Sequence, residues 1–412
     1  MAIPLMKSQN DSNKIKLMIY AIHPIMYQTP IFSELNKYKK LKLSWLDFKV
    51  YFGSNLSMKE TYFSTFQSKI KSDYSNLLEG YDYEFLKNFT FNEREGFFSR
   101  INFGIIPKIL FGKYDVILLH GYNTITSLII LLFARLSRKK IIFRGESIIR
   151  SSEIFSSFKN ILKKIYLKIF FYFCHRVLYS CTGNKYFFIN YGVPLYKLEY
   201  IPCAVNNKFF QKKVKELLPF KNKIKDSIGI KDNDLVLSMC CSFIKRKRPI
   251  DLINAVKKLD YKNNIFLLFI GDGPEKFLIE SSLKNSGIRY HITGFLGQND
   301  IAKYYIVSDV SLILSDYDPS PKTLNEAMNF SNCIIGTRDV GTSIDLIKNN
   351  INGYIIETAN IESLAKIIAN LEKNRDKTLK MGQESLKIVS EFNYQKNVKA
   401  IENVILDIKN EF

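Results

Sequence analysis

A strand, a short loop and the start of a helix near residue 320 form the part of this sequence best suited to bind an anion. The apolar residues 310–314 predict a buried strand, and residues 322–329 predict a helix. Ser320 is of a type that caps helices, and Pro321 suits the first helical position. Because the first amides of a helix lack partners within it, they can hold a phosphate. The predicted donors are the amides of Lys322, Thr323 and Leu324.

Two carboxylates accompany this helix start with the spacing D-x7-E. Glu326 lies about 7 Å along the helix axis, at 1.5 Å per residue. A carboxylate there can bind a ribose diol while the amides hold a diphosphate. Asp318 comes just before the cap and could hold a second hydroxylated group. The pattern therefore indicates a site for a hydroxylated diphosphate ligand.

Short apolar strands alternate with helical patterns along the chain, which favours parallel sheets with helices on both faces. In the first half we expect strands at residues 14–22, 116–120, 140–143, 176–180 and 199–201. In the second half we expect them at residues 235–240, 265–270, 290–293, 310–314, 333–336 and 353–356. Helices fill the intervals, including one that starts near Pro30 and one over residues 249–259.

The length of 412 residues suggests two or three domains. We expect an α/β fold with two doubly wound, Rossmann-like domains, at residues 1–207 and 208–393, and a separate amphipathic helix at residues 394–412. Residues 206–217 lack clear periodicity and are the expected linker. Since ligands bind off the carboxyl ends of strands in open parallel sheets, two such domains would enclose a cleft between those ends.

Polar side chains also follow the strands expected in the N-terminal half. His120 ends one apolar strand, and Arg144 and Glu146 come directly after the next. All three are candidates for the cleft, with a structural histidine and a salt bridge at the domain interface as the alternatives. His23 follows the first strand and is a further candidate; its alternative is a hydrogen bond within its own turn.

These residues resemble the family 4 retaining glycosyltransferases of the GT-B fold, the glycosyl transferases group 1. That family has E-x7-E before an E-A-M helix, and this chain has Asp318 for the first Glu and then Glu326-Ala-Met. Residues 23–30 and 143–147 are similar to members that act in bacterial surface polysaccharide synthesis. Similar segments occur in the family's order at residues 249–256, 271–274, 293–295, 339–341 and 352–353.

The resemblance implies roles for single residues. Glu326 would bind the donor ribose, Asp318 would contact the hydroxyls of the donor sugar, and His120 would lie near that sugar. Lys247 would neutralise the leaving diphosphate, since a lysine beside phosphoryl oxygens stabilises the charge that develops there. The alternative for Lys247 is a solvated loop charge.

Two further donor-site positions follow from the same resemblance. Phe295 would pack near the nucleotide base, and its alternative is a core aromatic residue. Ser242 stands where the family usually has an arginine that shares the diphosphate charge. Basic neighbours that could compensate for that arginine are Lys245, Arg246 and Arg248.

The resemblance also implies an activity. A hexosyl or related sugar would pass from a nucleotide-diphosphate-sugar to a glycan or polyprenyl-diphosphate-linked acceptor, with retention, in capsule, O-antigen or exopolysaccharide biosynthesis. The N-terminal domain would serve the acceptor, the C-terminal domain the donor, and the last helix would cross back. No cofactor or metal is expected, although Asp316-Tyr-Asp318 formally matches the DxD pattern that binds manganese in another glycosyltransferase fold. The alternative function is a non-catalytic binding or scaffolding protein with this fold.

The net charge of +21 favours an anionic partner. Residues 1–207 contain 29 basic and 14 acidic residues, a net +15. An AT-rich genome is the competing explanation. Nucleic acid is not the expected partner, because zinc-finger, RNP and Arg-rich patterns are missing from the sequence. Residues 156–176 mix lysines with apolar residues, which is typical of a helix in an anionic membrane interface or of a surface helix on the domain core.

Targeting signals and cysteines bear on the compartment. The sequence does not open with a signal-peptide pattern. Its six cysteines show no CxxC spacing and read as reduced core residues. The expected location is the cytoplasm, with possible peripheral contact at the inner face of the plasma membrane.

Overall fold

The computed structural model describes residues 14–58, 61–63, 68–70, 77–91, 96–150, 158–260 and 264–411. Within these residues, the first sheet contains seven parallel strands in the spatial order β5 (Tyr83–Phe85), β2 (Leu46–Phe52), β1 (Ile15–Ala21), β6 (Val116–His120), β7 (Lys140–Arg144), β8 (Arg176–Tyr179) and β9 (Leu198–Tyr200). A small antiparallel pair is formed by β3 (Thr61–Phe63) and β4 (Ser68–Ile70).

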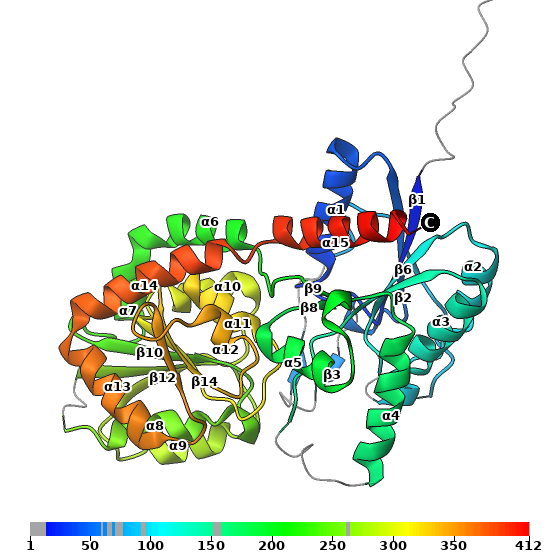
Figure 1. Ribbon diagram of the computed structural model, residues 1–412. Helices are drawn as coiled ribbons and strands as arrows, with labels where there is room; N and C mark the ends of the chain where they lie inside the picture. Colours follow the sequence, from blue (N-terminus) through cyan, green and yellow to red (C-terminus); the bar gives the residue numbers. More distant parts are fainter. Residues whose placement is uncertain are drawn as a thin grey trace, which may run out of the picture.

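The second sheet, also within the described residues, contains six parallel strands. Their spatial order is β12 (Arg289–Ile292), β11 (Ile265–Ile270), β10 (Leu235–Cys240), β13 (Val310–Ile313), β14 (Cys333–Thr337) and β15 (Gly353–Ile356). Figure 1 shows the two sheets in two separate halves of the molecule, each with helices around it. The expected fold of two doubly wound, Rossmann-like domains is confirmed.

Two strands of the first sheet, β2 and β5, are missing from the expected set. The sequence of β2 is LDFKVYF, in which charged residues interrupt the apolar run, and β5 has only three residues. Pairing with β1 nevertheless buries Leu46, Val50 and Phe52 completely. Neighbouring strands therefore decide the structure of this segment, because its own pattern is weak.

Alternating side chains of the central strands form a core on each face of the first sheet. Leu17 and Ile19 of β1 pack on the face that carries α1, whereas Met18 and Tyr20 pack on the opposite face. The described helices of this half are α1 (Thr29–Leu41), α2 (Ile105–Phe111), α3 (Ile125–Leu136), α4 (Phe158–Tyr172) and α5 (Thr182–Asn190), with the 3-10 turns η1 (Leu56–Met58), η2 (Phe97–Ser99) and η4 (Leu195–Lys197).

The second sheet is built in the same way. Leu237 of β10 belongs to the core on one face and Val236 to the core on the other. The helices of this half are α6 (Asn207–Leu217), α7 (Lys221–Ser227), α8 (Pro249–Lys257), α9 (Lys276–Leu283), α10 (Gln298–Tyr305), α11 (Lys322–Met328), α12 (Ser343–Leu346), α13 (Ile361–Lys373) and α14 (Arg375–Ser390), with the 3-10 turns η5 (Leu218–Phe220) and η6 (Lys245–Lys247).

The segment expected to be an irregular linker is a helix. The side chain of Asn206 caps α6 by accepting a hydrogen bond from the amide of Phe209 at 3.1 Å. Among the residues of α6, Phe210 alone is buried, and it joins the core below the second sheet. Val214 and Leu217 pack against the same core at helical spacing from Phe210, so the sequence does carry an amphipathic pattern, which the prediction of a linker missed.

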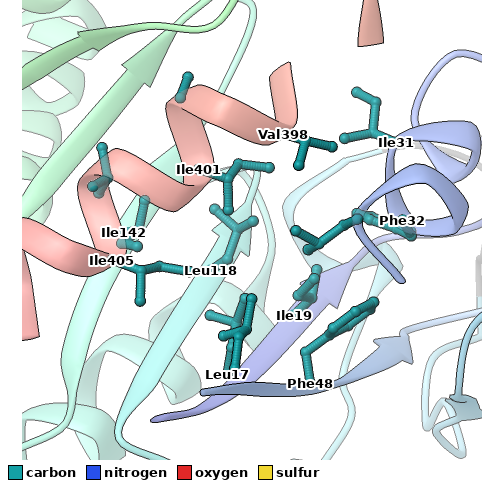
Figure 2. Close-up of a cluster of buried hydrophobic side chains, with 14 of the residues drawn as sticks. Leu17, Ile19, Ile31, Phe32, Phe48, Leu118, Ile142, Val398, Ile401 and Ile405 are labelled. Atoms are coloured by element: carbon teal, nitrogen blue, oxygen red, sulfur yellow. The ribbon is translucent and has the colours of Figure 1, made fainter. Parts of the chain in front are cut away.

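The last helix, α15 (Tyr394–Lys409), packs on the first sheet although it follows the second sheet in the chain. Figure 2 shows Val398, Ile401 and Ile405 of α15 among side chains of β1, β6 and α1. All three are essentially inaccessible to solvent. The chain thus passes between the two halves twice, once after β9 and once before α15.

Two observations concern the environment of the protein. None of the described helices is long and apolar enough to cross a bilayer. All six cysteines lie within the described ranges, and all are free thiols, as expected from their irregular spacing.

Candidate active site

Two neighbouring strands of the second sheet lead into the loops that carry the predicted charged residues. β10 pairs with β13 in parallel, so the loops that follow them meet at one edge of the sheet. Lys247 ends the turn η6 after β10, and its ammonium forms an ion pair with Asp318, which follows β13. Both side chains are largely buried. The alternative of Lys247 as a solvated loop charge is therefore wrong.

The cap of the helix that follows Asp318 lies one residue later than predicted. Pro321 occupies the cap position in an extended conformation, and no side chain caps the helix. Ser320 instead donates a hydrogen bond to the sulfur of Cys203 at 2.9 Å. The prediction of Ser320 as the N-cap is wrong, because its hydroxyl faces the segment between the two halves. The helix starts at Lys322, and Thr323 and Leu324 follow in its first turn.

Glu326 is held by two tyrosines from different halves of the molecule. Tyr27, from the loop after β1, donates to Oε1 at 2.6 Å, and Tyr305, at the end of α10, donates to Oε2 at 3.1 Å. The carboxylate is 2% exposed. Burial raises its pKa, and the hydrogen bonds from the two tyrosines only partly oppose this effect. A ligand hydroxyl that reaches Oε1 must compete with Tyr27.

His120 and Arg144 end adjacent strands of the first sheet and pair in register. Both are buried. Burial, followed by the nearby guanidinium of Arg144, holds the pKa of His120 well below its ordinary value, so the imidazole is neutral near pH 7. Its Nδ1 contacts the amide of Gln28, whereas its Nε2 has no hydrogen-bond partner among the described residues. A buried polar atom without a partner is costly, which suits a ligand contact.

Glu146 links the two halves. Lys322 donates to its two oxygens at 3.1 and 3.3 Å, and Arg144 lies 3.6 Å from Oε1. Burial raises the pKa of Glu146, but the two cations outweigh it and lower the pKa overall. The ammonium of Lys322 also lies 3.0 Å from the sulfur of Cys203. For Glu146, the alternative of a domain-interface salt bridge is thus confirmed, which does not prevent a ligand role.

The remaining predicted residues are His23, Phe295 and Ser242. His23 contacts the carbonyl oxygen of Pro24 at 3.3 Å, so the bond within its own turn is present. Phe295 is 41% exposed, and its alternative as a core aromatic residue is wrong. Ser242 is partly exposed in the loop between β10 and η6.

Two of the basic neighbours of Ser242 are engaged elsewhere. Arg246 donates to the carbonyl oxygen of Tyr317 at 2.6 Å. Arg248 binds Asp251 at 2.6 and 3.2 Å. Compensation for the missing arginine by either residue would require these contacts to break.

Tyr27, Gln28, Cys203 and Tyr305 are parts of the site that are absent from the predicted set. Tyr27 and Gln28 lie in the turn after the first strand, where the position beyond a parallel strand was a usable signal. Tyr305 reads from sequence as an ordinary core residue. Cys203 comes from the crossing segment, and only the three-dimensional packing brings it to α11.

The cluster as a whole offers complementary chemistry. The ammonium of Lys247 can stabilise negative charge on phosphoryl oxygens, and Glu326 can accept hydrogen bonds from a diol. Neutral His120 presents one unpaired ring nitrogen to a hydroxyl or carbonyl group. Such a set suits a phosphorylated, hydroxylated ligand at the carboxyl ends of both sheets.

Comparison with known proteins agrees with this chemistry. Residues 220–387 match the family model described as Glycosyl transferases group 1. A relative in Bacillus anthracis, N-acetyl-alpha-D-glucosaminyl L-malate synthase, is 31% identical over 188 residues, which cover 45% of this chain and 49% of that protein. The UDP-Gal:alpha-D-GlcNAc-diphosphoundecaprenol alpha-1,3-galactosyltransferase of Escherichia coli is 26% identical over 226 residues, which cover 52% and 54%.

Both matches span about half the length of these curated relatives. The fold likeness extends further. The crystal structure of HepE from Anabaena in complex with UDP superposes with a TM-score of 0.69 and 16% identity, over 96% of this chain and 100% of that one.

Proposed function

The chain contains a Glycosyl transferases group 1 domain and has the GT-B fold, and we propose that it is a retaining glycosyltransferase that uses a nucleotide-diphosphate-sugar. The main support is the position of Lys247 and Glu326, which reach the same sheet edge from the neighbouring strands β10 and β13. A phosphate-binding cation and a diol-binding carboxylate are the two groups that such a donor needs.

Each part of the donor has a candidate partner in this proposal. Glu326 binds the ribose, and Phe295, with its exposed ring, stacks near the base. Lys247 and the first amides of α11, at Lys322, Thr323 and Leu324, bind the diphosphate. Asp318 and the free Nε2 of His120 contact the sugar, which is a hexose or a related sugar. HepE, whose fold is similar, was crystallised in complex with UDP, which supports a nucleotide as the ligand of this fold.

The reaction breaks the bond between the anomeric carbon and the diphosphate oxygen. The acceptor oxygen forms its bond on the same face of the sugar, and its proton passes to the departing phosphate. The protein then contributes charge stabilisation and positioning, which can supply a large part of the rate increase. Lys247 is the group best placed to stabilise the leaving diphosphate.

We propose that transfer needs no metal and no cofactor. Of the two carboxylates in the DxD pattern, Asp316 is exposed, whereas Asp318 is ion-paired with Lys247. A divalent cation would have to displace that lysine. Activity that disappears with EDTA and returns with Mn²⁺ would contradict this part of the proposal.

The proposed acceptor is a glycan carried on polyprenyl diphosphate, in the synthesis of a surface polysaccharide such as capsule, O-antigen or exopolysaccharide. The support is the name of the Escherichia coli relative, which acts on a diphosphoundecaprenol-linked sugar. Such an acceptor places the reaction in the cytoplasm at the inner face of the membrane. The net +15 of residues 1–207 supports a peripheral contact with anionic lipids there.

The first test is thermal stabilisation by UDP, GDP, ADP and CMP, followed by the sugars of the base that binds. We expect one nucleoside diphosphate at 100 times its Kd to raise Tm by about 5 °C, and its sugar to be transferred to an acceptor detected by mass spectrometry. If none of these nucleotides stabilises the protein and no sugar is transferred, the result favours the non-catalytic alternative. The serine at position 242, in place of an arginine, would then explain the loss of donor binding.

Tyr27 should compete with the donor, because it donates a hydrogen bond to the carboxylate of Glu326, which is the proposed ribose ligand. We therefore expect Tyr27→Phe to lower the Kd of the preferred nucleoside diphosphate by on the order of tenfold, the effect of one hydrogen bond to a charged group. Isothermal titration calorimetry measures this change. Tyr304→Phe, one position from the other tyrosine, is the control; a weaker Kd in Tyr27→Phe would mean that Tyr27 contacts the donor itself.

A further inference from the structure

Helix α4 has two apolar faces, of which the described residues cover only one. Leu167, Phe170 and Phe171 are buried in the core beneath the first sheet. On the opposite side a second apolar stripe faces outward, with between 50% and 76% of each side chain exposed. This outer stripe consists of Phe158, Ile161, Leu162, Ile165, Ile169 and Tyr172. A surface helix that only covers its own core would carry polar residues there.

Two lysines of α4, Lys164 and Lys168, flank the outer stripe. At 100° per residue, Lys164 and Lys168 fall on one edge of it, and Lys163 falls beyond the other edge. Lys164 and Lys168 are exposed, and the sequence of the helix, FKNILKKIYLKIFFY, contains no acidic residue. Long lysine side chains beside an apolar stripe can extend their ammonium groups to phosphates while the stripe is buried in acyl chains.

Exposed apolar residues continue beyond both sides of α4. Tyr166 of α4 contacts the ring of Phe97, whose neighbour Phe98 is 67% exposed. At the end of the helix, the ammonium of Lys197 binds the carbonyl oxygen of Tyr172 at 3.0 Å. Lys197 closes the turn η4, whose two preceding residues, Leu195 and Tyr196, are 66% and 75% exposed. A wide exposed apolar surface of this kind marks an interaction site.

From these observations we propose that the outer stripe of α4 docks the protein on an anionic membrane surface, with Lys164 and Lys168 on lipid phosphates. The inference deepens the proposed function, on which it rests for its purpose, since a polyprenyl-linked acceptor is reached only at a membrane. The lysines and the absence of acidic residues favour anionic lipid over a protein partner. The sequence allowed either a core-facing or a membrane-facing helix; in the structure α4 presents both faces.

The direction of α4 relates this surface to the site. α4 follows β7 and precedes β8, which is parallel to β7, so the helix begins near the carboxyl edge of the first sheet. His120 and Arg144 lie at that edge. In Figure 1, α4 also lies on the side of the N-terminal half away from α15, so α15 does not cover it. Docking by α4 would bring the acceptor end of the site close to the headgroups.

The test is co-sedimentation of the full chain with vesicles of neutral phosphatidylcholine alone, or with about 30% phosphatidylglycerol added to supply anionic headgroups. We expect binding to the anionic vesicles only, reduced at least tenfold in Lys164→Glu/Lys168→Glu and in Ile165→Ser/Ile169→Ser. Matched controls on the other half, Lys377→Glu/Lys380→Glu and Phe277→Ser/Leu379→Ser, should bind like the wild type.

The outcomes separate this inference from the proposed function. All substituted residues are exposed, so unchanged Tm values and unchanged stabilisation by nucleotide would show intact variants. Equal binding of wild type and α4 variants, or no binding to anionic vesicles, would overturn the membrane proposal while leaving donor binding unaffected. The membrane proposal would also be overturned if the wild type does not bind vesicles but forms a dimer in light scattering that Ile165→Ser/Ile169→Ser abolishes. The outer stripe would then bind a second copy of the chain.

Discussion

Replacing Lys247 by methionine is expected to lower kcat for sugar transfer by about 10²- to 10³-fold, as removal of one charge-stabilising group from an active site does. Its ammonium is buried, and it forms an ion pair with Asp318 beside the start of α11. Charge on the leaving diphosphate grows as the glycosidic bond breaks, so the substitution should destabilise mainly the transition state. Initial-rate kinetics should therefore show a much smaller change in KM than in kcat.

Stability must be separated from chemistry in this experiment. Lys247→Met alone leaves the Asp318 carboxylate buried without its partner, which costs on the order of 3 kcal/mol of folding free energy. The double variant Lys247→Met/Asp318→Asn removes both charges and should regain Tm without regaining kcat. Lys257→Met, an exposed lysine at the end of α8, is the control. A kcat within threefold of wild type for the single variant would show that Lys247 only stabilises the fold.

The strands were predictable where the local pattern is unambiguous. β11 is a continuous apolar run and β10 is interrupted only by Ser238, and the expected bounds of both strands agree with the observed ones. β2 was not predictable, since Asp47 and Lys49 interrupt it and its pairing with β1 supplies the missing information. The helix α6 was predictable from Phe210, Val214 and Leu217, which recur at helical spacing and pack on one core, but the prediction of a linker overlooked this pattern.

The site residues fall into the same two groups, those that a local pattern predicts and those that only the packing brings together. Asp318 and Glu326 are found from sequence because they lie after a strand and in the helix that follows it, whereas Lys247 is found through the resemblance to the glycosyltransferase family. The pairing of Lys247 with Asp318 spans 71 residues, and the bond from Tyr27 to Glu326 spans 299. No local pattern encodes a contact of that separation. What the sequence shows is therefore which groups reach the sheet edge, and the packing of the two halves decides which groups meet.

Replacing Glu326 by glutamine is expected to maintain or raise the stability of the protein and to weaken its binding of the nucleotide. Burial raises the pKa of the carboxyl group above its ordinary value of 4.5. The folded protein then holds this proton at pH values where the unfolded chain has released it. The wild type should lose stability as the pH rises above about 4.5 through the raised pKa. Glutamine has no charge to bury; its amide oxygen can accept the hydrogen bond from one tyrosine, and its NH2 group can donate to the hydroxyl oxygen of the other.

The apo Tm of Glu326→Gln at pH 7 should therefore equal or exceed that of the wild type, and it should vary less with pH. Thermal scans between pH 4.5 and 8 measure both quantities. Glu280→Gln, an exposed carboxylate on α9, is the control for the charge change itself. A Tm at pH 7 several degrees below wild type would show that the carboxylate stabilises the fold, and the pKa argument would then be wrong.

Binding should change the other way. A carboxylate accepts two hydrogen bonds from a ribose diol, whereas the amide of glutamine offers one acceptor and turns donors towards the second hydroxyl. Hydrogen bonds to a charged group contribute about 1.5–3 kcal/mol, so the Kd of the preferred nucleoside diphosphate should rise about 10- to 100-fold. A variant that is at least as stable as the wild type yet binds nucleotide this weakly would show that the buried charge destabilises the fold but is needed to bind the donor. Unchanged Kd would instead leave Glu326 as a structural partner of the two tyrosines and move the ribose site elsewhere.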